Sequence, residues 1–301
     1  MSILVVGSVA LDSVRTPFGE AKEALGGSAS YFAAAARHFN PVAVIAVVGE
    51  DFPPQHLKML EGLDGVDLTS LERAKGATFR WAGEYAQDLN SRTTLDTQLN
   101  VFADFNPRLK PQHCELEYVF LANIHPELQN KVLDQVKTPR YVVLDTMNYW
   151  IRGSRKELET TLARVDAVLL NDEEARLLSG SSNIYTAAHK VIDMGPSLVV
   201  VKKGEHGAVL ISKDFIVVVP AFPLESVSDP TGAGDSFAGG FVGYLSTCAD
   251  PRDENALRSA AAHGVVTASF AVESFSLNRL AQATRQEIDT RLKALRELAR
   301  F

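Results

Sequence analysis

One short segment combines a turn of small residues, a carboxylate and the start of a helix. It runs Ser228-Asp229-Pro230-Thr231-Gly232-Ala233-Gly234-Asp235-Ser236-Phe237. A small-residue turn that leads into a helix leaves several backbone N–H groups unpaired and directed at one point, which suits an anion such as a phosphate. A carboxylate at that point, Asp235, could remove a proton from a substrate. The segment predicts an anion site beside a general base, while a simple capping role for Asp235 stays open.

The residues that follow this turn have the spacing of a helix with one buried face. Aromatic and apolar residues recur there at i, i+4, i+7 and i+8, namely Phe237, Phe241, Tyr244 and Leu245. That period is typical of an amphipathic helix packed on a core. We therefore expect a helix that begins at the small-residue turn.

Short apolar runs rich in β-branched residues recur along the chain, with helical segments between them. Runs bounded by Gly, Pro or Asp are typical of strands buried on both faces. Their alternation with helices predicts an α/β fold with a mostly parallel sheet. The expected strands are Ile3–Gly7, Val42–Gly49, Tyr118–Ala122, Tyr141–Asp145, Ala167–Asn171, Ser197–Lys202, Ala208–Ile211 and Phe215–Val219.

Polar residues directly after these runs are candidates for the site. Ligands of open α/β sheets bind outside the carboxyl ends of the strands. The residues in that position are Asp12, Asn123, His125, Asp145, Asn171 and Lys203.

The region from Thr78 to Phe102 breaks the alternation. It is rich in Thr, Phe, Trp and Tyr and contains turn residues, so it predicts extended strands. We expect a single domain over residues 1–301, with a β lid formed approximately by residues 12–25 and 76–102. The lid is expected to close over the substrate and to pair with its copy in a homodimer.

The end of the chain, Thr284–Phe301, predicts a surface helix. Its apolar residues recur at helical spacing with charged residues between them, and they are Ile288, Leu292, Leu295 and Ala299. The charged residues have both signs, which argues against membrane binding by this helix.

Composition excludes several classes of protein. The chain has 301 residues and a formal net charge of −7, which does not suit nucleic-acid binding through a general basic surface. Its two cysteines are far apart, so neither a disulfide framework nor a cysteine zinc site is indicated. No apolar run approaches the roughly 20 residues that span a bilayer. The N-terminus lacks the pattern of a signal peptide, and we expect a cytoplasmic protein without a membrane partner.

Taken in chain order, several motifs resemble those of the ribokinase-like (PfkB-type) carbohydrate and nucleoside kinases. The segment around Asp235 is similar to the family signature Asp-Thr-x-Gly-Ala-Gly-Asp, and five shorter motifs match in the same order. The resemblance covers nearly the whole chain. It implies a three-layer α/β/α fold with a mostly parallel central sheet and a small β-stranded lid. The shorter motifs are Gly7–Asp12, Gly26–Ala29, Val48–Asp51, Asn171–Glu174 and Gly204–Gly207.

The resemblance also implies an ATP-dependent phosphotransferase that uses Mg²⁺. In such an enzyme Asp235 would be the catalytic base, and the backbone of Gly232, Ala233 and Gly234 would hold phosphoryl oxygens. Glu174 would lie near Mg²⁺, through water. The nucleotide side would be formed by Asn171, Lys202, Gly204, Gly207 and Thr231. Asp229 is a candidate for a monovalent cation such as K⁺, with a turn role equally open.

The acceptor side rests on the same resemblance. Asp12 would bind the acceptor hydroxyls, and Gly26 and Gly27 match the family's paired glycines beside the substrate. The sequence departs from the family in three places. Ser30 and Tyr31 are nearest to the position of a sugar-binding Asn, with the register between them open. His125 ends a strand where ribokinase-type members carry a Glu, and Lys202-Lys203 stand where relatives often have a Thr or a neutral residue before the Gly. We expect Tyr31 and His125 to contact the substrate, although a structural role for His125 stays open.

Three functions remain open from the sequence. The first is phosphorylation of a hydroxyl on a small sugar or sugar-like polyol. The second is a nucleoside kinase, for which Phe79, Tyr31, Tyr149 and Trp150 would provide stacking surface. The third is a catalytically silent ligand-binding protein on the same fold. Arg80 and Arg92 in the lid would bind a phosphate already on the acceptor, or are ordinary surface residues if the acceptor is neutral.

Overall fold

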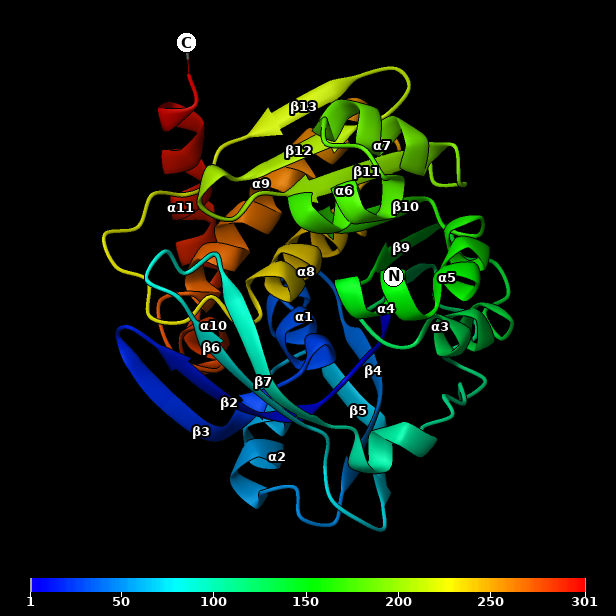
Figure 1. Ribbon diagram of the computed structural model, residues 1–301, viewed down its shortest axis with the longest axis vertical. Helices are drawn as coiled ribbons and strands as arrows, with labels where there is room; N and C mark the ends of the chain where they lie inside the picture. The colour runs from blue at the N-terminus through cyan, green and yellow to red at the C-terminus, as the bar shows by residue number, and fades with distance from the viewer. Residues whose placement is uncertain (1, 301) are drawn as a thin grey trace.

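A nine-stranded sheet forms the centre of the molecule (Figure 1), in a computed structural model that describes residues 2–300. The strand order is β13-β12-β11-β10-β9-β8-β1-β4-β5. All neighbours pair in parallel except β12 with β11 and β13 with β12, which are antiparallel. The strands are β1 (Ile3–Val6), β4 (Val42–Gly49), β5 (Val66–Ala74), β8 (Tyr118–Leu121), β9 (Tyr141–Asp145), β10 (Ala167–Asn171), β11 (Leu198–Lys202), β12 (Ala208–Ile211) and β13 (Ile216–Val219).

Helices cover both faces of this sheet, which makes three layers. Alternate residues of β1 enter opposite cores: Ile3 and Val5 join one, and Leu4 and Val6 join the other. The first core is covered by α1 (Ser28–Ala36), α2 (Pro54–Glu61), α8 (Ala233–Leu245), α9 (Glu254–Ala271), α10 (Asn278–Gln282) and α11 (Arg285–Leu298). The second is covered by the short 3₁₀ helix η1 (Asn100–Asp104), α3 (Pro126–Leu133), α4 (Asn148–Gly153), α5 (Arg155–Leu162), α6 (Asp172–Ser179) and α7 (Ile184–Ile192).

Every expected strand of the central sheet is present within one residue of its expected ends, but one strand was not expected. β5 carries charged residues such as Asp67, Glu72 and Arg73, so its sequence lacks the continuous apolar pattern of a buried strand. It lies at the edge of the sheet, beside β4. An edge strand has one open side, so its sequence can be polar where a central strand cannot.

A second sheet of four strands, in the order β3-β2-β6-β7, lies beside the central one at the lower left of Figure 1. Its strands are β2 (Ala10–Thr16), β3 (Gly19–Gly26), β6 (Arg80–Tyr85) and β7 (Arg92–Gln98). These are the two segments expected to form the lid. β2 starts only four residues after the end of β1, so the small sheet is tied directly to the carboxyl end of a central strand.

The C-terminal helix α11 is present and begins with a capping box, in which Thr284 and Glu287 satisfy each other's backbone N–H groups. Ile288, Leu292 and Leu295 are buried, as expected. Ala299 follows the helix, and the last expected residue, Phe301, lies outside the described residues.

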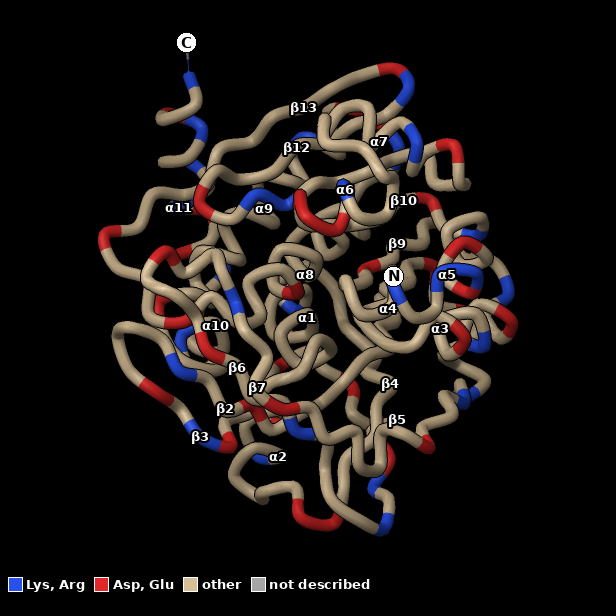
Figure 2. Tube along the Cα trace, viewed as in Figure 1, with Lys and Arg blue, Asp and Glu red and all other residues tan. Residues whose placement is uncertain are grey.

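Charged residues of both signs are interspersed along the chain in the view of Figure 2. Within residues 2–300, no helix is long and apolar enough to cross a membrane.

Candidate active site

The turn before α8 has the geometry of an anion site. Gly232 caps the helix with a φ of 76°, in the left-handed region that favours glycine. A Cβ at this position would overlap the ring of Tyr31, so the two residues are in close contact. Among the described residues, the amides of Gly232 and Gly234 have no hydrogen-bond partner in the protein, whereas the N–H of Ala233, expected to hold a phosphoryl oxygen too, donates to the carbonyl of Pro230 at 3.2 Å. These amides, at the positive end of a helix dipole, fit phosphate oxygens.

Asp235 lies in the first turn of α8 and is partly exposed. Burial and the neighbouring charge of Asp145 raise the pKa of Asp235 to about 7, against the opposing effects of Lys202 and Arg92. A carboxyl group with a pKa near neutrality can accept a proton and release it again. This is the property that a general base requires.

Lys202 connects the nucleotide-side strands to this helix. Its Nζ lies 2.6 Å from Oδ2 of Asp145, and both side chains are largely buried. The same Nζ would lie 3.0 Å from a Cβ built on Gly234. The absence of a side chain at Gly234 therefore allows an ammonium group to approach the start of α8.

Asn171 and Glu174 form a reciprocal capping box at the start of α6. Asn171 Oδ1 accepts the N–H of Glu174, and Glu174 Oε2 accepts the N–H of Asn171, each at 2.7 Å. Burial raises the pKa of Glu174 to about 7, and Lys202 opposes this effect. The second carboxylate oxygen of Glu174 has no hydrogen bond within the described chain, which leaves a ligand atom for a metal-bound water.

Residues 2–300 hold no group of three or more His, Cys, Asp or Glu side chains arranged to bind a metal. Mg²⁺ is usually bound by one or two carboxylates together with substrate phosphates and water. Glu174 beside the anion site fits that mode of binding, whereas an all-protein metal cage does not fit.

Asp12 is close to the same cluster of charges. Its side chain packs against Gly26, where a Cβ would overlap the carboxylate, and it accepts the backbone N–H of Gly27. Burial raises the pKa of Asp12 to about 7, and Asp229 and Asp235 add to this effect. Gly26 therefore leaves room for this buried carboxylate, whose charge is close enough to interact with that of Asp235.

The small sheet reaches the site through two residues that the sequence did not single out. The hydroxyl of Tyr85, on β6, lies 3.2 Å from Oγ1 of Thr231. In the loop between β6 and β7, Asn90 Nδ2 donates to Glu205 at 3.4 Å, beside the turn Gly204–Gly207. The small sheet thus contacts both the start of α8 and the loop after β11. A tyrosine in an alternating strand has no sequence signal for this role.

Arg92, at the start of β7, is close enough to the site for its charge to act there. Its charge lowers the pKa of Asp12, Asp235 and Glu174, but burial outweighs this effect and raises all three. Arg80 differs, because it pairs with Glu23 at 2.7 Å and with Asp51 at 2.8 Å. Arg80 therefore links strands and a loop, whereas the exposed Arg92 lies over the ring of Trp81, 5.2 Å from its centroid.

His125 has structural contacts at both ring nitrogens. Nδ1 accepts the N–H of Glu127 and thereby caps α3, and Nε2 lies 3.2 Å from Oγ of Ser154. An accepting Nδ1 requires the proton on Nε2, which then donates to Ser154. The ring also packs edge-on against Trp150. With both nitrogens occupied, the structure favours the structural role for His125 over substrate contact.

Asp229 is buried and accepts the N–H of Thr231 at 2.8 Å and that of Ser276. These bonds are those of a turn residue that ties the α8 turn to the segment before α10. Both hydrogen bonds come from backbone N–H groups. The binding of a monovalent cation by Asp229 stays a proposal.

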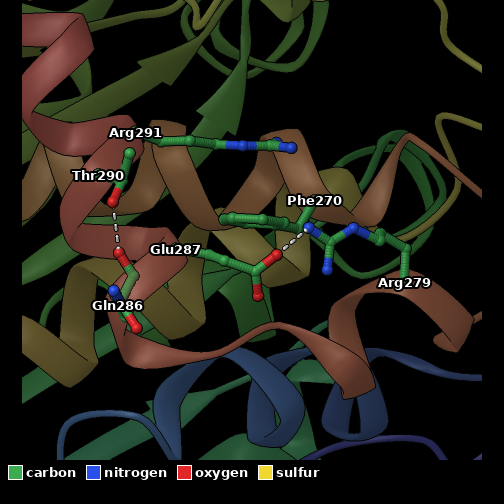
Figure 3. A pocket seen from close by; sticks show the side chains of 6 residues that line it. All are labelled: Phe270, Arg279, Gln286, Glu287, Thr290 and Arg291. Carbon is green, nitrogen blue, oxygen red and sulfur yellow. Dashed lines mark hydrogen bonds and ion pairs between the residues drawn. The ribbon is translucent and has the colours of Figure 1, made fainter.

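Two cavities lie outside the cluster of Asp12, Asp235 and Lys202. One of about 260 Å³ lies between α9, α10 and α11 (Figure 3). Arg279 and Glu287 point toward each other across it, 2.7 Å apart, and the guanidinium of Arg291 lies over the ring of Phe270. Its charged groups are already paired, so it has the character of a packing defect between helices. The other, of about 420 Å³, lies between η1, α3 and α4, beside His125 and Trp150.

A family model described as pfkB family carbohydrate kinase matches residues 2–283. The chain belongs to this family. The protein is thus an ATP-dependent kinase, as the resemblance implied.

Similar proteins act on different acceptors. The cytidine kinase of Thermococcus kodakarensis is 29% identical over 251 residues, which cover 81% of this chain and 88% of that protein. The nucleoside kinase of Methanocaldococcus jannaschii, an archaeal member of the ribokinase family, superposes with a TM-score of 0.77 at 22% identity, over 97% of this chain and 98% of that one. The fructokinase of Vibrio cholerae, solved with fructose, ADP and calcium, superposes with a TM-score of 0.75 at 21% identity, over 97% and 98%. These structures confirm the three-layer fold and do not decide the acceptor.

The kinase should lose activity and gain stability as the pH falls below neutrality. Burial raises the pKa of Asp12, Asp235 and Glu174 to about 7 each, well above the ordinary range of carboxyl groups. If Asp235 is the general base, its protonation should make kcat/KM fall about tenfold per pH unit below about 7. The folded state binds more protons than the unfolded state between about pH 4 and 7, so the free energy of unfolding of the nucleotide-free protein falls as the pH rises through that window. A pH profile of kcat/KM with its midpoint near 4 would contradict this prediction.

Proposed function

We propose that this kinase transfers the terminal phosphoryl group of ATP to a hydroxyl of a sugar moiety, with Asp235 as general base. The observation that carries the proposal is the placement of Asp235 at the start of α8, with the free amides of Gly232 and Gly234 beside it and Asp12 in the same group of charges. One position thus offers a base, an anion site and a carboxylate for hydroxyl groups.

Each residue then has a defined task. Asp12 accepts hydrogen bonds from acceptor hydroxyls and orients them, and Asp235 takes the proton of the reacting hydroxyl. The hydroxyl oxygen bonds to the phosphorus as the bond from that phosphorus to ADP breaks, and the amides of the α8 turn stabilise the charge on the transferring group. Asn171, Gly204, Gly207 and Thr231 surround the nucleotide. Mg²⁺, held through water by Glu174, would neutralise charge on the phosphates.

The acceptor belongs to one of two classes. A single buried carboxylate such as Asp12 suits the hydroxyls of a free sugar or polyol, with Gly26, Gly27 and Tyr31 as its surroundings. The similarity to the cytidine kinase favours the second class, a nucleoside whose ribose binds at Asp12. In that case the base would extend past the sugar, toward the small sheet.

A panel of acceptors tests the proposal. ADP formation would be measured with cytidine, adenosine, inosine, ribose, fructose and a polyol at matched concentrations. A nucleoside preference of at least about tenfold in kcat/KM assigns the second class, because a site built to bind the base leaves polar groups unpaired when the base is missing. Turnover with none of these compounds, in a protein that binds ATP, would refute the proposed acceptor chemistry.

We also propose that the small sheet acts as a lid and pairs with its copy in a homodimer. All residues of β7 are exposed, and Leu95 on β7 and Phe18 at the β2–β3 turn are exposed apolar side chains. An exposed sheet edge with apolar residues is suited to strand pairing. The expected result in solution scattering is the mass of a dimer, and a monomer at high concentration would contradict it.

We also propose that K⁺ binds near Asp229. The measurement is kcat with and without added KCl, and we expect KCl to increase it.

A further inference from the structure

Lys202 and Asp145 form a buried ion pair across the central sheet. In the parallel register, Lys202 on β11 lies opposite Asn171 on β10, whereas Asp145 on β9 lies opposite Leu169. The Lys202 side chain therefore reaches across the end of β10 to meet Asp145, with 2.6 Å between Nζ and Oδ2. Burial disfavours the charged form of Lys202, but Asp145 and Glu174 outweigh it and raise its pKa. The lysine is a fixed cation.

Asp145 itself is immobilised by its surroundings. Its Oδ1 accepts the N–H of Thr146 at 2.8 Å, and its backbone carbonyl accepts from Gln129 at 3.1 Å. Only 6% of its side chain is exposed. A carboxylate held in this way fixes the position of whatever cation it pairs with.

The ammonium group also lies beside the start of α8. A Cβ built on Gly234 would lie 3.0 Å from Nζ, and the free N–H groups there carry partial positive charge. A cation and a helix N-terminus repel each other unless a negative group lies between them. Two independent features, the free amides and the directed ammonium, thus point to the same anion.

We propose that Asp145 is a positioning residue for phosphoryl transfer, which holds the Lys202 ammonium at the α8 turn so that Lys202 contacts the polyphosphate of the nucleotide. The inference rests on the proposed anion site at Gly232–Gly234 and is independent of the acceptor. A purely structural ion pair between β9 and β11 is the competing account, and both accounts predict that breaking the pair lowers stability.

The double variant separates the two accounts. Lys202→Met alone leaves the Asp145 carboxylate buried and unpaired, so it should lower stability strongly. Lys202→Met combined with Asp145→Asn removes both charges and should restore most of the lost stability. We expect kcat about 100-fold below wild type in Lys202→Met and about 10-fold or more below in Asp145→Asn. The double variant should stay within about threefold of Lys202→Met, because Asp145 acts through Lys202. Recovery of kcat together with Tm in the double variant would show that the pair is structural, and multiplying effects would show that Asp145 acts on its own.

Nucleotide binding gives a readout that needs no acceptor. Titration calorimetry with ADP and with the imido analogue of ATP should show dissociation constants raised about 10-fold in Lys202→Met and about 3-fold or more in Asp145→Asn. If the acceptor panel fails but this binding pattern holds, the inference stands while the proposed acceptor falls. Unchanged constants and unchanged kcat in Asp145→Asn would overturn it.

Asp166 offers a matched control on the same sheet. It precedes β10 at the opposite end, where it pairs with Arg252 at 2.6 Å and accepts the N–H of Val142. Asp166→Asn should lower Tm while kcat and the nucleotide dissociation constants stay at wild-type values.

Discussion

Asp235→Asn should lower kcat by about three orders of magnitude, because a general base contributes on the order of 10²- to 10⁴-fold to such a reaction. The amide has nearly the same size and leaves the α8 turn intact, so the dissociation constant for ATP should change by less than about threefold. Steady-state kinetics and titration calorimetry measure the two effects. A variant that keeps more than about a tenth of the wild-type kcat would refute the assignment of Asp235 as the base.

The same variant should be more stable than the wild type above pH 7. The raised pKa of Asp235 shows that the folded state disfavours its charged form, and asparagine removes that charge. We expect a Tm a few degrees higher at pH 8, a gain in stability where activity is lost. Asp253, which caps α9 through the N–H of Ala256, provides the control. Asp253→Asn preserves a capping side chain and should change neither kcat nor Tm appreciably. If Asp235 were only a cap, the two variants would behave alike.

Gly232→Ala has the second largest expected effect. Two costs combine at this position: a φ of 76° disfavours any side chain by about 1–2 kcal/mol, and a Cβ would overlap the ring of Tyr31. Relief of the overlap must move either the turn or Tyr31, so the amides that form the anion site lose their alignment. We expect kcat to fall by about 100-fold or more, since the loss of one such donor costs about that much.

Gly180 is the matched control for the backbone cost. It caps the C-terminus of α6 with a φ of 66°, and nothing lies within 4 Å of a Cβ built there. Gly180→Ala should therefore lower the free energy of unfolding by about 1 kcal/mol and leave the kinetics unchanged. Chemical denaturation compares the two variants. Equal losses of stability, with normal activity in Gly232→Ala, would show that the Tyr31 contact has no role in shaping the turn.

The sequence predicted the central sheet well because buried strands leave a strong pattern. Val42–Gly49 and Tyr141–Asp145 are continuous apolar runs and end at the predicted residues. β5 escaped prediction because an edge strand need not be apolar. The helix after Gly232 was predicted from its period and from the conformational demands of a small-residue turn.

The candidate site was predicted in part. Asp12, Asp235 and Glu174 carry motif signals, and all three lie close enough to share electrostatic neighbours. Tyr85 carries no such signal, since its contact with Thr231 depends on how the small sheet folds back. His125 follows a strand in the way that a ligand-binding residue would, but its ring nitrogens bond to Glu127 and Ser154. A one-dimensional pattern places a residue at the edge of a sheet and does not say which of its atoms remain free.

The sequence alone identified candidate residues whose types suit phosphoryl transfer, and it predicted the α/β sheet that carries them. Those properties depend on residue type and on short-range period, which are local. Only the tertiary structure decided that Lys202 meets Asp145 across a strand, that Tyr31 packs on Gly232, and that several buried carboxyl groups share one region and so have raised pKa values. Each of these three contacts or effects depends on distances between residues far apart in the chain and on the exclusion of water from between them. Local sequence spacing encodes neither the distances nor the exclusion of water.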